Sequence, residues 1–141
     1  MLDTLHGTEV SVRPRYADLF QALRDPDPAR ADSAFDAILF DRADAIPDLA
    51  EAYEMFRKEP ELRFCVVQLL GFTEDARAIP HVMDALCDPD PGVRAEACRA
   101  LEDLRARDAT QALLERSEDL DPVVREAARE ALGAMMGTDD P

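Results

Sequence analysis

A segment of the second half of the chain occurs twice. Positions 90–101 read DPGVRAEACRAL, and positions 121–132, which lie 31 residues later, read DPVVREAAREAL. The same Asp, Pro, Val, Arg, Ala and Leu stand at the same offsets in both copies. A fixed period of roughly 20–50 residues is typical of proteins built from short units that stack in one direction. The repeat therefore constrains the fold more strongly than any other feature of the chain.

Each copy has the pattern of an amphipathic helix. Asp90 suits an N-cap, and Pro91 suits the first helical position, where no backbone donor is needed. The apolar residues of the two copies then fall on one helical face: Val93, Ala97, Ala100, Leu101 and Leu104, and Val124, Ala128, Ala131, Leu132 and Met135. A further apolar helical pattern precedes each copy, at 79–86 and at 109–113. One unit is thus two helices joined by a turn, and units must stack to bury their apolar faces.

The period extends toward the N-terminus. Residues 59–63 (EPELR) lie 31 residues before 90–94, and Asp27-Pro28 opens a more degenerate unit with Ala31 at the Arg position. Breaks at Pro and Asp predict helices over 15–24, 28–40, 44–57, 60–72, 76–87, 91–106, 108–117 and 122–136. No strand pattern is present in the sequence. We expect a polar tail over 1–14, one repeat domain over 15–137 and a short tail over 138–141.

The pattern Asp-x-(Asp/Glu)-Pro-x-Val-Arg-x-x-Ala-x-x-Ala-Leu resembles the HEAT repeat, especially the short bacterial form first described in phycobilisome lyases. The resemblance covers residues 25–137. It implies an all-α fold, a right-handed α–α superhelix (HEAT-type solenoid) of about eight helices. It is specific for the fold and says little about function.

The resemblance also implies a role for the recurring Arg. In HEAT repeats an Asp six residues before this Arg helps to bind successive turns together into a ladder. Asp88 with Arg94 and Asp119 with Arg125 fit this pattern. Arg57 stands in the Asp position before Arg63, so we expect the ladder to be interrupted in the N-terminal half.

Composition narrows the classes of function. The formal net charge is −15, which disfavours binding to nucleic acids and to anionic membranes, because phosphate groups require a basic surface. No apolar run is long enough for a membrane helix, and residues 1–11 are polar, so we expect a soluble, cytoplasmic protein. Cys65, Cys87 and Cys98 lack the spacing of a disulfide framework or a metal site. The acidity itself fits either a binding surface or an adaptation that keeps the protein soluble.

A row of polar residues suggests a binding surface. The resemblance implies that one helix of each unit lines the concave surface, and we assign this role to the helices that carry Gln21, Glu51, Asp84 and Glu115 at equivalent positions. Asp18, Asp48, His81 and Ala112 form a neighbouring row. We therefore predict an acidic stripe that binds a partner through Asp48, Glu51, His81, Asp84 and Glu115.

The stripe does not have the spacing of a catalytic site. Packed helices lie about 8–10 Å apart, whereas two-metal or shared-proton chemistry needs carboxylates much closer together. His81 and Asp84 are one helical turn apart, but the sequence supplies no third ligand, nucleophile or anion-binding loop beside them. We predict no catalytic residue, no metal site and no cofactor.

Two apolar surfaces are candidate interfaces. The helix predicted over 60–72 has Phe64 and Val67 on a face that is more polar in later units. Either the degenerate first repeat covers this face, or the N-terminal tail or a second subunit does. The last predicted helix carries Leu132, Met135 and Met136 and has no following partner helix. These residues are either adequately covered on one side or available to dock onto another chain.

The function predicted from these features is that of a non-enzymatic scaffold or adaptor. Its groove would hold a basic or extended protein segment that is attracted by the acidic stripe. One alternative is an enzyme accessory that resembles the bilin lyases. Another is an acidic inhibitor or immunity protein for a basic toxin or nuclease. The sequence leaves the oligomeric state open.

Overall fold

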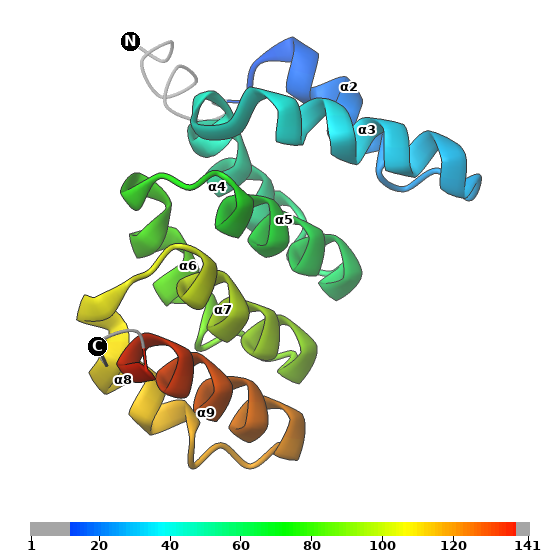
Figure 1. The fold of residues 1–141 in the computed structure, drawn as a ribbon. Helices are drawn as coiled ribbons and strands as arrows, with labels where there is room; N and C mark the ends of the chain where they lie inside the picture. Colours follow the sequence, from blue (N-terminus) through cyan, green and yellow to red (C-terminus); the bar gives the residue numbers. More distant parts are fainter. Residues whose placement is uncertain (1–11, 138–141) are drawn as a thin grey trace, which may run out of the picture.

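The computed structural model describes residues 12–137, and this part of the chain is all-helical (Figure 1). Its α-helices are α2 (Pro14–Ala22), α3 (Pro28–Asp41), α4 (Ile46–Met55), α5 (Pro60–Phe72), α6 (Ile79–Ala85), α7 (Pro91–Asp103), α8 (Thr110–Arg116) and α9 (Pro122–Gly137). Short 3₁₀ helices at Arg42–Ala45, Ala76–Ala78 and Arg107–Ala109 lead into α4, α6 and α8. The predicted all-α solenoid is confirmed, and each predicted helix is present.

The longer helices begin where proline and an acidic cap predict. α3, α5, α7 and α9 each start at a proline, which needs no hydrogen-bond acceptor at this position. The Asp27 carboxylate accepts from the backbone N–H of Ala29 at 3.0 Å, and the Asp90 carboxylate accepts from Val93 at 3.1 Å. These caps satisfy donors that the first helical turn leaves without partners.

The helices pair into four units, α2–α3, α4–α5, α6–α7 and α8–α9, which stack in order (Figure 1). Contact between successive units runs mainly through α5, α7 and α9, whereas α4, α6 and α8 contact one another sparsely. In a curved stack, neighbouring elements lie closest on the inner side. We therefore call α3, α5, α7 and α9 the inner layer and α2, α4, α6 and α8 the outer layer.

Small residues allow the inner helices to lie close together. A Cβ atom added to Gly71 on α5 would lie 2.8 Å from the Cβ of Ala100 on α7. Ala97 and Ala128, at equivalent positions of α7 and α9, are fully buried. The core runs continuously through all four units and is built mainly from Leu, Val and Ala, with Tyr16, Phe20 and Phe56 at its N-terminal end.

A ladder of buried ion pairs joins the turns within the C-terminal three units. Arg63 donates from Nε and Nη2 to both carboxylate oxygens of Asp88, at 2.8 and 2.9 Å. Arg94 makes the same two-point contact with Asp119, at 3.1 and 3.0 Å. Each pair crosses to the next unit, 25 residues along the chain. We call each such Arg–Asp pair a rung of the ladder. The Arg63–Asp88 rung forms although Arg57 occupies the Asp position before Arg63, because the carboxylate comes from the turn of the following unit.

Other polar contacts replace the ladder between the first two units. The rung position is empty there because Ala31 stands where Arg63 and Arg94 stand later. Instead, Arg24 donates to both carboxylate oxygens of Glu59 at 2.7 Å, and its guanidinium lies over the ring of Phe56. The interruption expected for the N-terminal half is therefore present at this one junction.

The two candidate apolar interfaces belong largely to the core. Val67 is fully buried, and Phe64 is half-buried against the core. Leu132 and Met135 are also buried, because α9 packs against both α7 and α8. Met136 is 65% exposed. Coverage within the chain therefore accounts for Val67, Leu132 and Met135, and for Phe64 only in part.

The structure describes only a small part of the two predicted tails. Most of the predicted 1–14 tail and all of the 138–141 tail lie outside the described residues. Within the described part, Val12 packs against the core and Arg13 is bound to α4. No helix in residues 12–137 is long and apolar enough to cross a membrane.

Candidate partner-binding site

The predicted acidic stripe lies on the outer layer. Glu51 is on α4, Asp84 is on α6 and Glu115 is on α8. The extensive contacts between successive units run through α5, α7 and α9, so the stripe does not lie on the closely packed layer. The three carboxylates still occupy equivalent positions in successive units, so they follow the outer surface of the stack.

Asp48 differs from the other members of the predicted stripe. Its side chain is 1% exposed and accepts hydrogen bonds from the backbone N–H, Nε and Nη2 of Arg13, at 2.8, 3.0 and 2.6 Å. Arg13 also donates to the carbonyl oxygen of Asp44 at 2.7 Å. Asp48 therefore attaches the start of α2 to α4 and offers no free carboxylate to a partner.

The remaining stripe residues are accessible, and their side chains have no partner among the described residues. Asp84 and Glu115 are exposed, and Glu51 and His81 are half-buried. Within the described part of the chain, none of these four side chains takes part in a hydrogen bond or an ion pair. Three carboxylates are therefore available in a row, one per unit.

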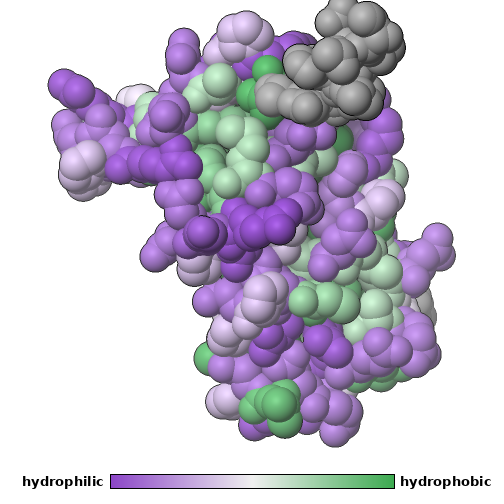
Figure 2. Space-filling model, turned by 180° about the vertical axis from the view of Figure 1, so that it is seen from behind, coloured by the Kyte–Doolittle hydropathy of each residue, from purple (hydrophilic) through white to green (hydrophobic). Residues whose placement is uncertain are grey.

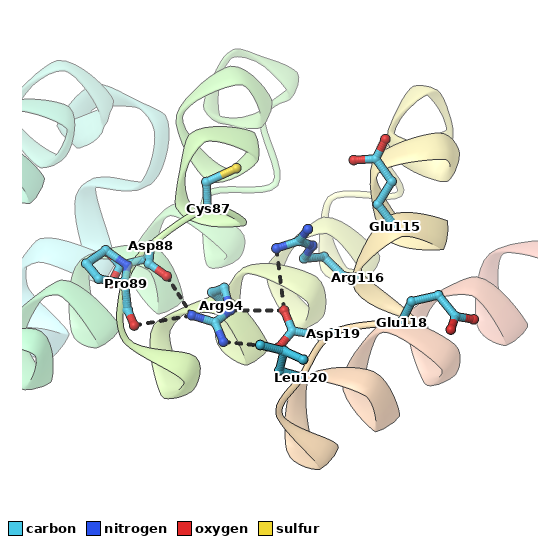
Figure 3. Close-up of a pocket in the computed structure, with 9 residues that line it drawn as sticks. All are labelled: Cys87, Asp88, Pro89, Arg94, Glu115, Arg116, Glu118, Asp119 and Leu120. Carbon is cyan, nitrogen blue, oxygen red and sulfur yellow. Dashed lines mark hydrogen bonds and ion pairs between the residues drawn. The ribbon is translucent and has the colours of Figure 1, made fainter.

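The row ends in a hollow between the α6–α7 turn and the α8–α9 turn (Figure 3). It is lined by Cys87, Asp88, Pro89, Arg94, Glu115, Arg116, Glu118, Asp119 and Leu120. The ladder engages the Asp88 and Asp119 carboxylates, and Arg116 lies 3.4 Å from Asp119. Glu115 and Glu118 have no such partner among the described residues. The hollow thus offers two free carboxylates.

An exposed leucine forms the rim of this hollow. Leu120 is 96% exposed, although the turn that holds it also supplies the buried Asp119. The preceding turns have Pro89 and Lys58 at the equivalent position. Sequence reasoning missed both Glu118 and Leu120 as site residues. An apolar residue in an otherwise polar turn was the available signal for Leu120.

The pKa values of both ladder carboxylates are lowered. Burial disfavours the charged form of Asp88, but hydrogen bonds from Arg63 and from the Tyr53 hydroxyl outweigh it and lower the pKa of Asp88. The pKa of Asp119 is also lowered, because its bonds to Arg94 and to the Asp121 backbone N–H outweigh burial. These two side chains are therefore structural anions.

Carboxylates of α7 behave in the opposite way. Burial raises the pKa of Glu96, and its 3.2 Å bond from Arg99 offsets this only in part. Burial also raises the pKa of Glu102 and of Asp103. The inner layer therefore carries carboxylates that destabilise the fold when they are charged.

The cysteines are chemically quiet or isolated. Burial raises the pKa of Cys98 to about 11 and also raises that of Cys65. Cys87 is exposed in the hollow, and no disulfide joins any of the three. Among residues 12–137 there is no group of three His, Cys, Asp or Glu side chains placed to hold a metal ion.

Comparison with known proteins agrees with the architecture. The fold is a solenoid of paired helices whose turns are joined by Arg–Asp ion pairs. Residues 56–133 match the family profile described as HEAT repeats. The chain belongs to the HEAT-repeat family. No curated protein matches the sequence significantly.

Several solved structures resemble the chain, and one of them does so over nearly its full length. Human deoxyhypusine hydroxylase in complex with glycerol has a TM-score of 0.73 and 23% sequence identity. The match covers 99% of this chain and 49% of that one, so this chain spans about half the length of the human enzyme. At this level of identity the likeness shows a shared fold.

Proposed function

We propose that this protein is a non-enzymatic interaction module that binds a basic segment of a protein partner along its outer layer. The observation that carries the proposal is the row of Glu51, Asp84 and Glu115, which are accessible and make no internal ion pair in the described chain. A net charge of −15 attracts a basic partner from a distance. Membership of a repeat family built on extended surfaces is consistent with this role.

The hollow beside Glu115 would anchor one basic side chain of the partner segment. A lysine or arginine placed between Glu115 and Glu118 would gain two carboxylates that have no internal partner. Its aliphatic stem would lie against Leu120 and remove apolar surface from water. Electrostatic steering along the row combined with one anchored side chain favours a basic and extended segment.

The experiment that tests this role is affinity capture from lysate of the source organism with three forms of the protein. The first is the parent, and the second carries Lys at Glu51, Asp84 and Glu115. The third is a matched control with Lys at Asp32, Asp36 and Glu130, which are exposed residues of the inner-layer helices α3 and α9. The two variants have the same net charge, so they separate a localised site from general acidity.

A partner held by the parent and the inner-layer control, but lost by the outer-layer variant, is the expected result. Equal loss with both variants would show that only overall charge matters. If the parent captures no partner, the result would favour the alternative that the protein is an enzyme accessory. A captured toxin or nuclease whose activity is blocked would instead identify the acidic-inhibitor alternative.

A further inference from the structure

The ladder has an unfilled position at the C-terminal end of the stack. Arg125 on α9 is equivalent to Arg63 and Arg94. Its Nη1 donates to the carbonyl oxygens of Asp119 and Leu120 at 2.8 and 3.2 Å. Arg94 uses Nη1 in the same way, on the carbonyl oxygens of its own turn. The guanidinium of Arg125 is therefore already held in the orientation that the internal rungs use.

What Arg125 lacks is the carboxylate. Arg63 and Arg94 each place Nε and Nη2 on an Asp of the following unit. Within residues 12–137, no acceptor contacts these two nitrogens of Arg125. A planar pair of donors is thus presented at the end of the stack, and such a pair matches a carboxylate in two-point geometry.

The opposite end carries the complementary half of a rung. Asp25, in the α2–α3 turn, accepts from the backbone N–H of Asp27 at 2.9 Å. The rung residues Asp88 and Asp119 accept from the residue two positions later at the same distance. Asp25 therefore has the rung conformation. Among the described residues, the cation that pairs with Asp25 is the largely exposed Arg30, at 3.8 Å.

Apolar surface accompanies both ends. At the C-terminal end, Leu114, Leu120 and Val123 are about half-exposed or more. At the N-terminal end, a mainly apolar hollow borders Asp25 and is lined by Leu19, Ala22, Ala29, Arg30, Ser33 and Ala34. Figure 2 shows a back surface that is mostly hydrophilic, with hydrophobic areas toward the α2–α3 end and at the opposite end. Each end thus pairs a rung group with apolar contacts.

We propose that a second copy of this chain stacks head to tail on the first, with Arg125 of one copy binding Asp25 of the next as an additional ladder rung. Such a contact joins two different surfaces, so it leaves both outer ends of a pair open for further copies. It continues the same edge of the stack along which the internal rungs lie.

The contact is expected to be weaker than the internal junctions. Internal units meet through Ala95 and Cys98, which are fully buried, whereas α9 has Glu126 and Arg129 at these positions. Polar residues on the outer face are typical of terminal repeats, and they limit how much surface a second copy can bury. The net charge of −15 opposes association as well. We therefore expect reversible, concentration-dependent stacking.

Analytical ultracentrifugation of the full chain over a range of concentrations tests the proposal. The samples are the parent, Arg125→Asp, Asp25→Arg and an equimolar mixture of these two variants. Alone, each variant brings like charges together at the contact, but in the mixture each junction between the two different variants again brings opposite charges together. Arg105→Asp and Asp32→Arg make the same charge changes at exposed positions outside the rung. Circular dichroism verifies that each variant is folded.

The parent is expected to increase in mean mass with concentration. Each rung variant alone should associate at least about tenfold more weakly, the mixture should regain association, and the two controls should match the parent. A parent that stays monomeric throughout would overturn the proposal. So would rung variants that associate as the parent does, or folded variants whose mixture fails to associate. Binding of Arg125 to a different protein without self-association would also exclude a second copy as its occupant.

Discussion

At the scale of single residues, the contribution of an arginine to folding stability depends on whether it belongs to the ladder. Arg63 and Asp88 have side chains that are 7% and 1% exposed, and Arg63 also binds the carbonyl oxygens of Phe56 and Arg57. Removing one member leaves the other as an unpaired buried charge. By contrast, Arg77 pairs with Asp75 at the surface, where water solvates either partner alone.

We predict that Arg63→Ala lowers the free energy of unfolding by about 3 kcal/mol. Urea unfolding followed by circular dichroism measures this change. Arg77→Ala is the control and should leave the urea midpoint unchanged. Equal effects of the two substitutions would show that the rung contributes no more than a surface ion pair.

A close approach between α5 and α7 depends on a single glycine, Gly71. In Gly71→Ala the new Cβ would lie 2.8 Å from the Cβ and 3.0 Å from the Cα of Ala100, so α5 and α7 must move apart. We expect a loss of about 1–3 kcal/mol in stability despite the better helix propensity of alanine. Gly133→Ala has open space around it and should gain up to about 1 kcal/mol. Thermal unfolding compares the two, and a stabilised Gly71→Ala would contradict the close packing.

Glu96 makes stability depend on pH. Because folding raises its pKa, the carboxyl favours the folded state at low pH, and this contribution is lost as pH rises through its folded-state pKa. Asp88 and Asp119 have lowered pKa values, so their contribution is lost as pH falls below the ordinary value of 3.8. Stability should therefore rise as pH falls from neutral through the raised pKa of Glu96, and fall again in stronger acid, where Asp88 and Asp119 become protonated.

Glu96→Gln should be more stable than the parent at neutral pH and should show a smaller gain on acidification. Urea midpoints for both proteins at neutral and mildly acidic pH measure the difference. An unchanged pH dependence in the variant would show that Glu96 is not the group responsible. Glu102 and Asp103 would then be the next residues to replace, since burial raises their pKa values too.

At the scale of helices, the units differ in how firmly they are held. α5, α7 and α9 contact one another extensively and are crossed by two rungs, whereas α3 contacts α5 more loosely and has no rung to it. In a repeat stack, each unit depends mainly on its neighbours, so weak junctions open independently.

Amide hydrogen exchange is expected to be fastest in α2 and α3 and slowest in α5 and α7. Asp48→Asn, which weakens the attachment of Arg13 to α4, should further speed exchange in α2 while leaving α7 unchanged. Mass spectrometry of peptic fragments resolves these segments. Uniform exchange across all four units would indicate that the stack opens as a single cooperative unit.

Helices were predictable from the sequence because their starts depend on local chemistry. Asp90-Pro91 and its equivalents specify a cap and a first turn wherever they occur. The layers were not predictable, because periodicity identifies equivalent residues but not the side toward which the stack curves. That side depends on close contacts such as Gly71 with Ala100. Asp48 was misjudged because its partner, Arg13, lies in a segment without periodic pattern.

At the scale of the whole molecule, the proposed function rests on the total charge and on where the carboxylates lie. An excess of acidic residues gives long-range attraction for a basic segment, and the outer row supplies carboxylates at regular intervals. Acidity that serves solubility alone would not need a particular row. The distinction between these two explanations is therefore a question of position and not of total charge.

The most direct test is the dissociation constant of the captured partner for the parent and for the two triple-lysine variants, measured by calorimetry at low and high salt. We predict that Lys at Glu51, Asp84 and Glu115 weakens binding at least about tenfold more than Lys at Asp32, Asp36 and Glu130. Parent affinity should fall as salt rises. Equal weakening by both variants, or affinity that salt does not change, would contradict a binding site on the outer row.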